Sequence, residues 1–233
     1  MMKISFWRRL LDLVSPRTCD VCGRRLSVSE SVLCACCLME IPYTRFWKSP
    51  LDNPMARLFW GHFPIERAAA LWFYEPHSEL CNPIYNLKYH GYAETGVELG
   101  AMAANYCRGD GFFDGIDGIV AVPLAPKRQR LRGYNQSEKI AEGIRLVTGL
   151  PIYNKVLRRK VFKGSQTDKN VWQRKENVAD AFELTDAETV RGKHLLIVDD
   201  VVTTGATITA CAQQLCLAGD VRISVLSVGF THS

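Results

Sequence analysis

The chain places two adjacent carboxylates, Asp199 and Asp200, directly after an apolar run over residues 195–198. A loop of small and hydroxylic residues then leads into a helical pattern; its members are Val201, Val202, Thr203, Thr204, Gly205, Ala206 and Thr207. Backbone N–H groups, hydroxyls and the positive end of a helix dipole together form a cradle for an anion. The loop lacks the Gly-Lys-[Ser/Thr] ending of a Walker motif and two glycines of a dinucleotide fingerprint.

The carboxylate pair limits which anion the cradle can hold. Asp199 and Asp200 would repel a bound phosphate unless they face groups that donate hydrogen bonds. A sugar with vicinal hydroxyls supplies such donors while its own phosphate occupies the loop. The pattern therefore predicts a 5-phosphoribosyl ligand, with a functionless acidic strand end as the alternative.

A second group of residues has the spacing of a metal site. Five of the nine cysteines fall between positions 19 and 37, and Cys19-x2-Cys22 is separated by eleven residues from Cys34-x2-Cys37. Two such pairs can close a tetrahedral shell around Zn²⁺, and four protein ligands leave no open position for catalysis. We therefore expect a structural zinc ion, with Cys36 as a surplus thiol.

Two basic clusters accompany these motifs. The first contains Lys127, Arg128, Arg130 and Arg132 and follows an apolar strand pattern over residues 119–123. Cations at that place suit a diphosphate leaving group, although a solvated surface loop is the alternative. The second lies in residues 158–177, which lack apolar periodicity and have the length of a lid or a disordered segment.

Apolar strand patterns alternate with helical ones over most of the chain. We expect strands over residues 68–74, 119–123, 152–157, 195–199 and 223–228, and helices over residues 94–107, 137–147 and 206–217. This order predicts an α/β fold with a mostly parallel sheet flanked by helices. The expected divisions are a four-cysteine module over residues 1–42, a packed connector over residues 43–67 and the main domain over residues 68–233.

The composition is that of an ordinary globular protein. The 233 residues are 47% hydrophobic and 23% charged, with a net charge of +5, which excludes wholesale disorder. No run approaches the length of about 18 apolar residues that a membrane span needs, and the first nine residues are charged too early for a signal peptide. We expect a cytoplasmic protein. A short amphipathic pattern over residues 4–14 either packs on its own domain or contacts the inner membrane surface.

The run over residues 198–207 resembles the phosphoribosyl diphosphate (PRPP) signature of type I phosphoribosyltransferases. Together with the four-cysteine module, it resembles the ComF family (ComFC- and GntX-like proteins) over nearly the whole chain. The resemblance implies a type I phosphoribosyltransferase fold, a Mg²⁺–PRPP ligand and a flexible loop that closes over the diphosphate. It also implies which residues contact the pyrophosphate or belong to the closing loop. These candidates are Lys88, Lys127, Arg128, Arg132, Gln166 and Arg174. Lys163 and Lys169 depart from the family's pattern in that loop.

The implied activity is pentosyl transfer, a glycosyltransferase reaction of nucleotide metabolism. An acceptor that the sequence does not identify displaces pyrophosphate from C1 of PRPP, with Asp199 and Asp200 as the catalytic pair. The chain has no N-terminal cysteine nucleophile, so an amidotransferase activity is not indicated.

The alternative is a non-catalytic protein that binds PRPP or handles single-stranded DNA in natural transformation, with competence proteins as partners. Aromatic residues that either stack on such a strand or fill the core are Trp7, Trp47, Phe59 and Trp60.

Overall fold

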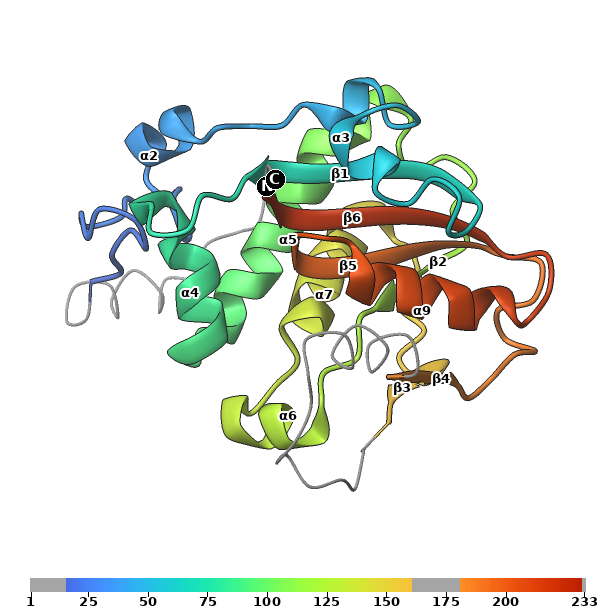
Figure 1. The fold of residues 1–233 in the computed structure, drawn as a ribbon. Helices are drawn as coiled ribbons and strands as arrows, with labels where there is room; N and C mark the ends of the chain where they lie inside the picture. Colours follow the sequence, from blue (N-terminus) through green and yellow to red (C-terminus); the bar gives the residue numbers. More distant parts are fainter. Residues whose placement is uncertain (1–15, 161–180, 232–233) are drawn as a thin grey trace.

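A computed structural model describes residues 16–160 and 181–231. Its centre is a four-stranded sheet in the order β1-β6-β5-β2, in which all neighbouring strands run parallel (Figure 1). The strands are β1 (Ile65–Phe73), β2 (Gly118–Ala121), β5 (His194–Val202) and β6 (Arg222–Phe230). The α/β class and the parallel sheet expected from the sequence are confirmed.

The strands read as continuous apolar runs because helices cover the sheet. The first five residues of β5 are buried, and so are the last eight of β6. The main covering helices are α5 (Ala93–Cys107), α7 (Gln136–Thr148) and α9 (Ala206–Cys216). Both α5 and α7 pack on the sheet and on each other, while α9 packs on β5 and β6.

Two glycines let α5 and α7 touch through their backbones. A Cβ atom at Gly100 would lie 2.0 Å from the carbonyl oxygen of Ile140, and one at Gly143 would lie 1.9 Å from that of Val97. Side chains at these positions would push the helices apart. The close crossing brings the first turn of α7 to the carboxyl edge of β5.

Shorter elements surround this frame. The N-terminal part contains α2 (Ala35–Glu40), the 3₁₀ turn η1 (Phe46–Lys48) and α3 (Pro54–Arg57). Between β1 and α5 lie η2 (Glu79–Cys81) and α4 (Asn82–Tyr89), and η3 (Arg108–Asp110) follows α5. A separate antiparallel pair joins β3 (Leu157–Arg159) to β4 (Phe182–Leu184).

The aromatic side chains before β1 are packed. Trp47 and Phe59 are buried, and Tyr43 stacks on Tyr106 of α5 with ring centroids 4.3 Å apart. Of the aromatic residues considered for strand stacking, Trp60 alone among those the structure describes is exposed. Trp47 and Phe59 therefore fill the core.

Three sequence expectations differ from the observed elements. The strand expected over residues 152–157 is wrong, because Ile152 makes only a single bridge to Ile119 and pairing resumes at Leu157 in the separate sheet. The basic run after β2 is not a loop but helix α6 (Pro126–Arg132), with proline at its first turn. Helix α4 was not expected, because it is only eight residues long.

Some sequence expectations lie outside the described residues. These are the amphipathic helix over residues 4–14, Trp7, and the loop candidates Gln166 and Arg174. In the described ranges, no helix is both long and apolar enough to cross a membrane.

Candidate functional site

The carboxylate pair lies at the carboxyl end of β5, where each acid has a partner from a different helix. The Asp199 Oδ1 atom accepts hydrogen bonds from the Ser137 hydroxyl of α7 at 2.8 Å and from the Asp200 backbone N–H at 2.9 Å. The Asp200 Oδ2 atom lies 3.2 Å from the Lys88 ammonium of α4. The Asp200 Oδ1 atom accepts a hydrogen bond from the Val201 backbone N–H at 2.6 Å. One hydroxyl, two backbone amides and one cation thus hold the two acids side by side.

The environment of Asp199 favours its protonated form. Burial, followed by the charge of Asp200, raises the pKa of Asp199 to about 7, although the hydrogen bond from Ser137 acts in the opposite direction. An acid with such a pKa populates both protonation states near neutral pH. It can therefore either accept a hydrogen bond from a sugar hydroxyl or donate one to it.

The loop after the pair ends in an uncapped helix. Strand β5 continues to Val202, so Val201 and Val202 belong to the strand and the turn is shorter than expected. Gly205 is the N-cap of α9, with φ of 73° and no side-chain cap. A Cβ atom there would lie 2.8 Å from the Phe59 ring, so glycine suits both the backbone angle and the space.

A small hollow of about 40 Å³ lies over this turn, lined by Asp199 and residues 201–208. The first backbone N–H groups of α9 have no capping side chain, and the positive end of the helix dipole is directed at the same place. The turn thus has the shape and the free N–H groups that the sequence-based prediction of an anion cradle requires, and anion binding there stays a prediction.

A second hollow, here called the central cavity, adjoins the carboxylate pair. It has a volume of about 250 Å³ and is lined by residues of α4, α6, α7, β3 and β5. Its cations are Lys88, Arg128, Arg132 and Arg159. Three candidates from the sequence thus meet here, whereas Lys127 does not line the cavity. Arg159 belongs to a basic cluster visible in the sequence, but its role depends on the β3–β4 pairing, which the sequence did not predict.

The arginines at the cavity have few acidic neighbours among the described residues, although the charge of Asp199 acts on Arg159. Within the part of the chain that the structure describes, no carboxylate forms an ion pair with Arg128, Arg132 or Arg159. Burial lowers the pKa of Arg159, and nearby Arg128 adds to this effect. The Arg159 guanidinium lies 5.2 Å from the Phe182 ring centroid. An anionic group in the cavity would therefore be stabilised by the charges of several arginines at once.

Residues 134–137 join the elements around the cavity. The Asn135 side chain caps α7 by accepting from the Ser137 N–H at 3.1 Å, and it donates to the Val122 carbonyl at 2.9 Å. The Tyr134 hydroxyl donates to the Leu87 carbonyl of α4 at 2.6 Å. The bonds of Asn135 hold Ser137 beside Asp199. The bond from Tyr134 fixes Leu87, and so places its neighbour Lys88 beside Asp200.

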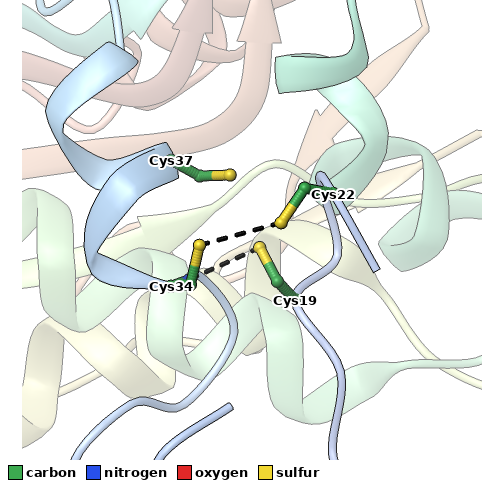
Figure 2. A group of neighbouring side chains, drawn as sticks. All are labelled: Cys19, Cys22, Cys34 and Cys37. Atoms are coloured by element: carbon green, nitrogen blue, oxygen red, sulfur yellow. Dashed lines mark hydrogen bonds between the residues drawn. The ribbon is translucent and has the colours of Figure 1, made fainter. Parts of the chain in front are cut away.

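The four predicted cysteine ligands converge in space (Figure 2). The Sγ atoms of Cys19, Cys22, Cys34 and Cys37 all lie within 4.8 Å of one another, and those of Cys22 and Cys34 are 3.7 Å apart. Tetrahedral zinc with Zn–S bonds near 2.3 Å requires sulfur atoms about 3.8 Å apart. The cluster therefore fits a metal such as zinc. Cys36 lies outside it, exposed, and accepts a hydrogen bond from Arg24 at 3.2 Å.

The chemistry of the thiols also fits a cation. The backbone N–H of Cys37 lowers the pKa of Cys34 to about 7, whereas burial raises that of Cys37. Four neighbouring thiols cannot all ionise without a compensating positive charge, and a divalent metal supplies it.

The cysteine loop is attached to the helices that border the cavity. Asp20 accepts a hydrogen bond from the Thr95 hydroxyl of α5 at 3.2 Å. Asp20 also bonds the side chain of Asn86 in α4, while burial raises its pKa. Since Asn86 lies two residues before Lys88, the cluster helps to position α4.

Comparisons with known proteins show which sequences the chain resembles. Residues 140–225 match the family model described as the phosphoribosyl transferase domain. The DNA utilization protein YhgH of Salmonella typhimurium is 27% identical over 223 residues, which are 91% of this chain and 96% of the relative. Competence protein F of Haemophilus influenzae is 29% identical over 110 residues, 47% of this chain and 48% of the relative.

Among solved structures, the glutamine PRPP amidotransferase from B. subtilis is 22% identical, with a TM-score of 0.38. The likeness covers 58% of this chain but only 26% of the other. The sequence matches show that the chain carries phosphoribosyltransferase-domain sequence and is homologous to YhgH and to competence protein F. The resemblance to the ComF family is thereby confirmed.

The raised pKa of Asp199 predicts a pH-dependent stability difference. The folded state favours the protonated form of Asp199. The stability that this form adds to the fold is therefore lost as the pH rises from about 4 through 7. The substitution Asp199→Asn keeps a side-chain oxygen that can accept the hydrogen bond from the Ser137 hydroxyl, and it removes the negative charge of the carboxylate. We expect this variant to be more stable than the wild type by about 1–2 kcal/mol at pH 8, with a smaller gap at pH 5. Urea unfolding at both pH values measures this. Exposed Glu94→Gln is the control, and an unchanged gap for Asp199→Asn would contradict the assignment.

The cysteine geometry predicts selective metal loss. Cys22→Ser removes one ligand, and we expect the purified protein to lose its zinc and about 3 kcal/mol or more of unfolding free energy. Elemental analysis and urea unfolding measure the two effects. Cys36→Ser removes a thiol from the same loop outside the cluster and should retain the metal. Equal zinc contents in the two variants would rule out the proposed ligand set.

Proposed function

We propose that the chain is a phosphoribosyltransferase that binds Mg²⁺–PRPP and transfers its phosphoribosyl group to an acceptor, releasing pyrophosphate. One observation carries this proposal: the Asp199–Asp200 pair lies between an uncapped helix turn and a cavity whose arginines have no carboxylate ion-pair partner among the described residues. A ligand with a phosphate at one end, hydroxyls in the middle and a diphosphate at the other end matches these three features in order.

The proposed placement assigns each part of PRPP to one feature of the site. The 5-phosphate occupies the turn and the first residues of α9; these are Thr203, Thr204, Gly205, Ala206 and Thr207. The ribose hydroxyls meet Asp199 and Asp200. The diphosphate extends toward Arg128, Arg132 and Arg159, where the structure leaves positive charge without carboxylate partners among the described residues.

The chemistry follows from charge placement. The lone pair of the acceptor forms a bond to C1 of the ribose, while the C1–O bond breaks and its electron pair leaves with pyrophosphate. Positive charge that develops on the ribose faces the carboxylate pair, and negative charge on the leaving group faces the arginines. Mg²⁺ bound with the diphosphate supplies further charge neutralisation. The chain's own residues contribute mainly positioning and electrostatic stabilisation.

The metal of the cysteine cluster has a structural role in this proposal. Four protein ligands leave no open coordination position for substrate. The contact from Asp20 to Asn86 instead connects the cluster to α4, which carries Lys88, and the contact to Thr95 connects it to α5.

Binding of Mg²⁺–PRPP tests the site. We expect the wild type to bind it in a calorimetric titration, and the double variant Asp199→Asn, Asp200→Asn to bind about 30-fold to 100-fold more weakly. The reason is that each substitution weakens charge-assisted hydrogen bonds to the ribose. The variant Glu94→Gln, Glu98→Gln removes the same charge from α5 and should bind normally. No binding by a folded, zinc-loaded wild type would overturn the proposal.

A second candidate function is the handling of single-stranded DNA, which the names of the relatives suggest. One structural observation favours it. Helix α6 has no buried residue and presents its cations at the surface; they are Lys127, Arg128, Arg130 and Arg132. The Arg132 guanidinium lies 5.3 Å from the Tyr89 ring centroid, and exposed Tyr92 lies near His90. Cations interleaved with exposed rings are typical of single-strand binding.

Oligonucleotide binding tests this second function. We expect fluorescence anisotropy to show oligothymidylate binding that weakens steeply with salt. Lys127→Glu with Arg130→Glu should weaken it at least tenfold without changing PRPP affinity, because neither residue lines the central cavity. The matched control is Lys48→Glu with Arg222→Glu, two exposed cations on other elements. Equal losses in both double variants would argue against a specific strand site.

A further inference from the structure

A third hollow, here called the outer hollow, adjoins the central cavity. It has a volume of about 840 Å³ and is lined by residues of α4, α6 and the turn after α4. Its cations are Lys88, Arg128 and Arg132, and Tyr89 and His90 add aromatic rings. None of the described residues that line it is acidic, so an anionic ligand meets no like charge on its wall.

The outer hollow shares all of its lysine and arginine side chains with the central cavity. Lys88, Arg128 and Arg132 line both spaces. The Lys88 ammonium lies 3.2 Å from a carboxylate oxygen of Asp200, so part of its charge is already compensated. Arg128 and Arg132 are therefore the cations on which an added anion in either space depends most.

A row of rings leads along the outer hollow. The ring centroids of Tyr89 and Tyr85 lie 4.7 Å apart, those of Tyr85 and His90 5.6 Å, and those of His90 and Tyr92 6.4 Å. All three tyrosines are exposed. The Arg132 guanidinium lies 5.3 Å from the Tyr89 ring centroid, so a cation accompanies the rings. Such a row suits a single nucleic-acid strand, whose bases stack on the rings while its phosphates meet the cations.

We propose that Mg²⁺–PRPP and a single DNA strand exclude each other from this protein, because the diphosphate of one and a phosphate of the other use the same two arginines, Arg128 and Arg132. The proposal rests on the two functions proposed above and links them. Donor groups that hold one ligand are not available to the other, and two anions on the same cations repel each other. Each ligand therefore lowers the affinity for the other by the same factor.

A competition experiment tests this exclusion. The binding of labelled oligothymidylate is followed by fluorescence anisotropy at constant ionic strength while Mg²⁺–PRPP is added. We expect saturating Mg²⁺–PRPP to raise the apparent dissociation constant of the oligonucleotide about tenfold or more, and Mg²⁺–pyrophosphate to do the same. Ribose 5-phosphate lacks the diphosphate and is the matched control. It should leave strand binding unchanged at concentrations at which calorimetry shows that it is bound.

A ring variant tests the position of the strand. Tyr92 lies at the end of the row and does not line the central cavity. Tyr92→Leu should weaken oligothymidylate binding about tenfold, because one base loses its stacking partner, and should leave PRPP affinity unchanged. Trp60→Leu removes a similarly exposed ring elsewhere and should change neither affinity.

The proposals fail in different ways. If both ligands bind the wild type with independent affinities, or if ribose 5-phosphate displaces the strand as pyrophosphate does, the exclusion is overturned and both proposed functions stand. Equal strand affinities of Tyr92→Leu and Trp60→Leu overturn the position of the strand. If the folded wild type binds no PRPP or no oligothymidylate, the corresponding function is overturned and the exclusion falls with it.

Discussion

The rest of the site depends on keeping two adjacent carboxylates together at the end of a buried strand. Burial and mutual repulsion both oppose the charged form of Asp199, as its raised pKa shows. The fold offsets this cost with Ser137 on one acid and Lys88 on the other. Both partners must therefore be held in place, and much of the surrounding structure serves that purpose. Asn135 fastens α7 to the end of β2, and glycine-mediated contact brings α7 against α5.

The cysteine cluster extends the same support to α4. Its loop contacts α4 and α5 through Asp20, so the four-cysteine loop and the helix bearing Lys88 are connected. A metal bound by the four cysteines would make this loop more rigid than its buried side chains alone could. This connection gives a physical reason for combining a four-cysteine cluster with phosphoribosyltransferase-domain sequence in one chain.

The two hollows that adjoin the carboxylate pair differ in chemistry. The turn before α9 offers backbone N–H groups, and the central cavity offers arginines and Lys88. The cations of α6 add a charged surface next to the central cavity, which Arg128 and Arg132 also line.

The sequence by itself determined the features that depend on short-range spacing. Three such features could be predicted, because each depends on residues that are neighbours in the sequence. They are the two Cys-x2-Cys pairs, the acid pair before its hydroxylic turn, and the apolar strands that alternate with helices. Only the tertiary structure decided which distant residues meet. Lys88 reaches Asp200 because α4 packs on α5 and is bonded by Tyr134, and Arg159 lines the cavity because residues 157–159 pair with β4. Such contacts follow from strand order and helix packing, which local sequence patterns do not encode.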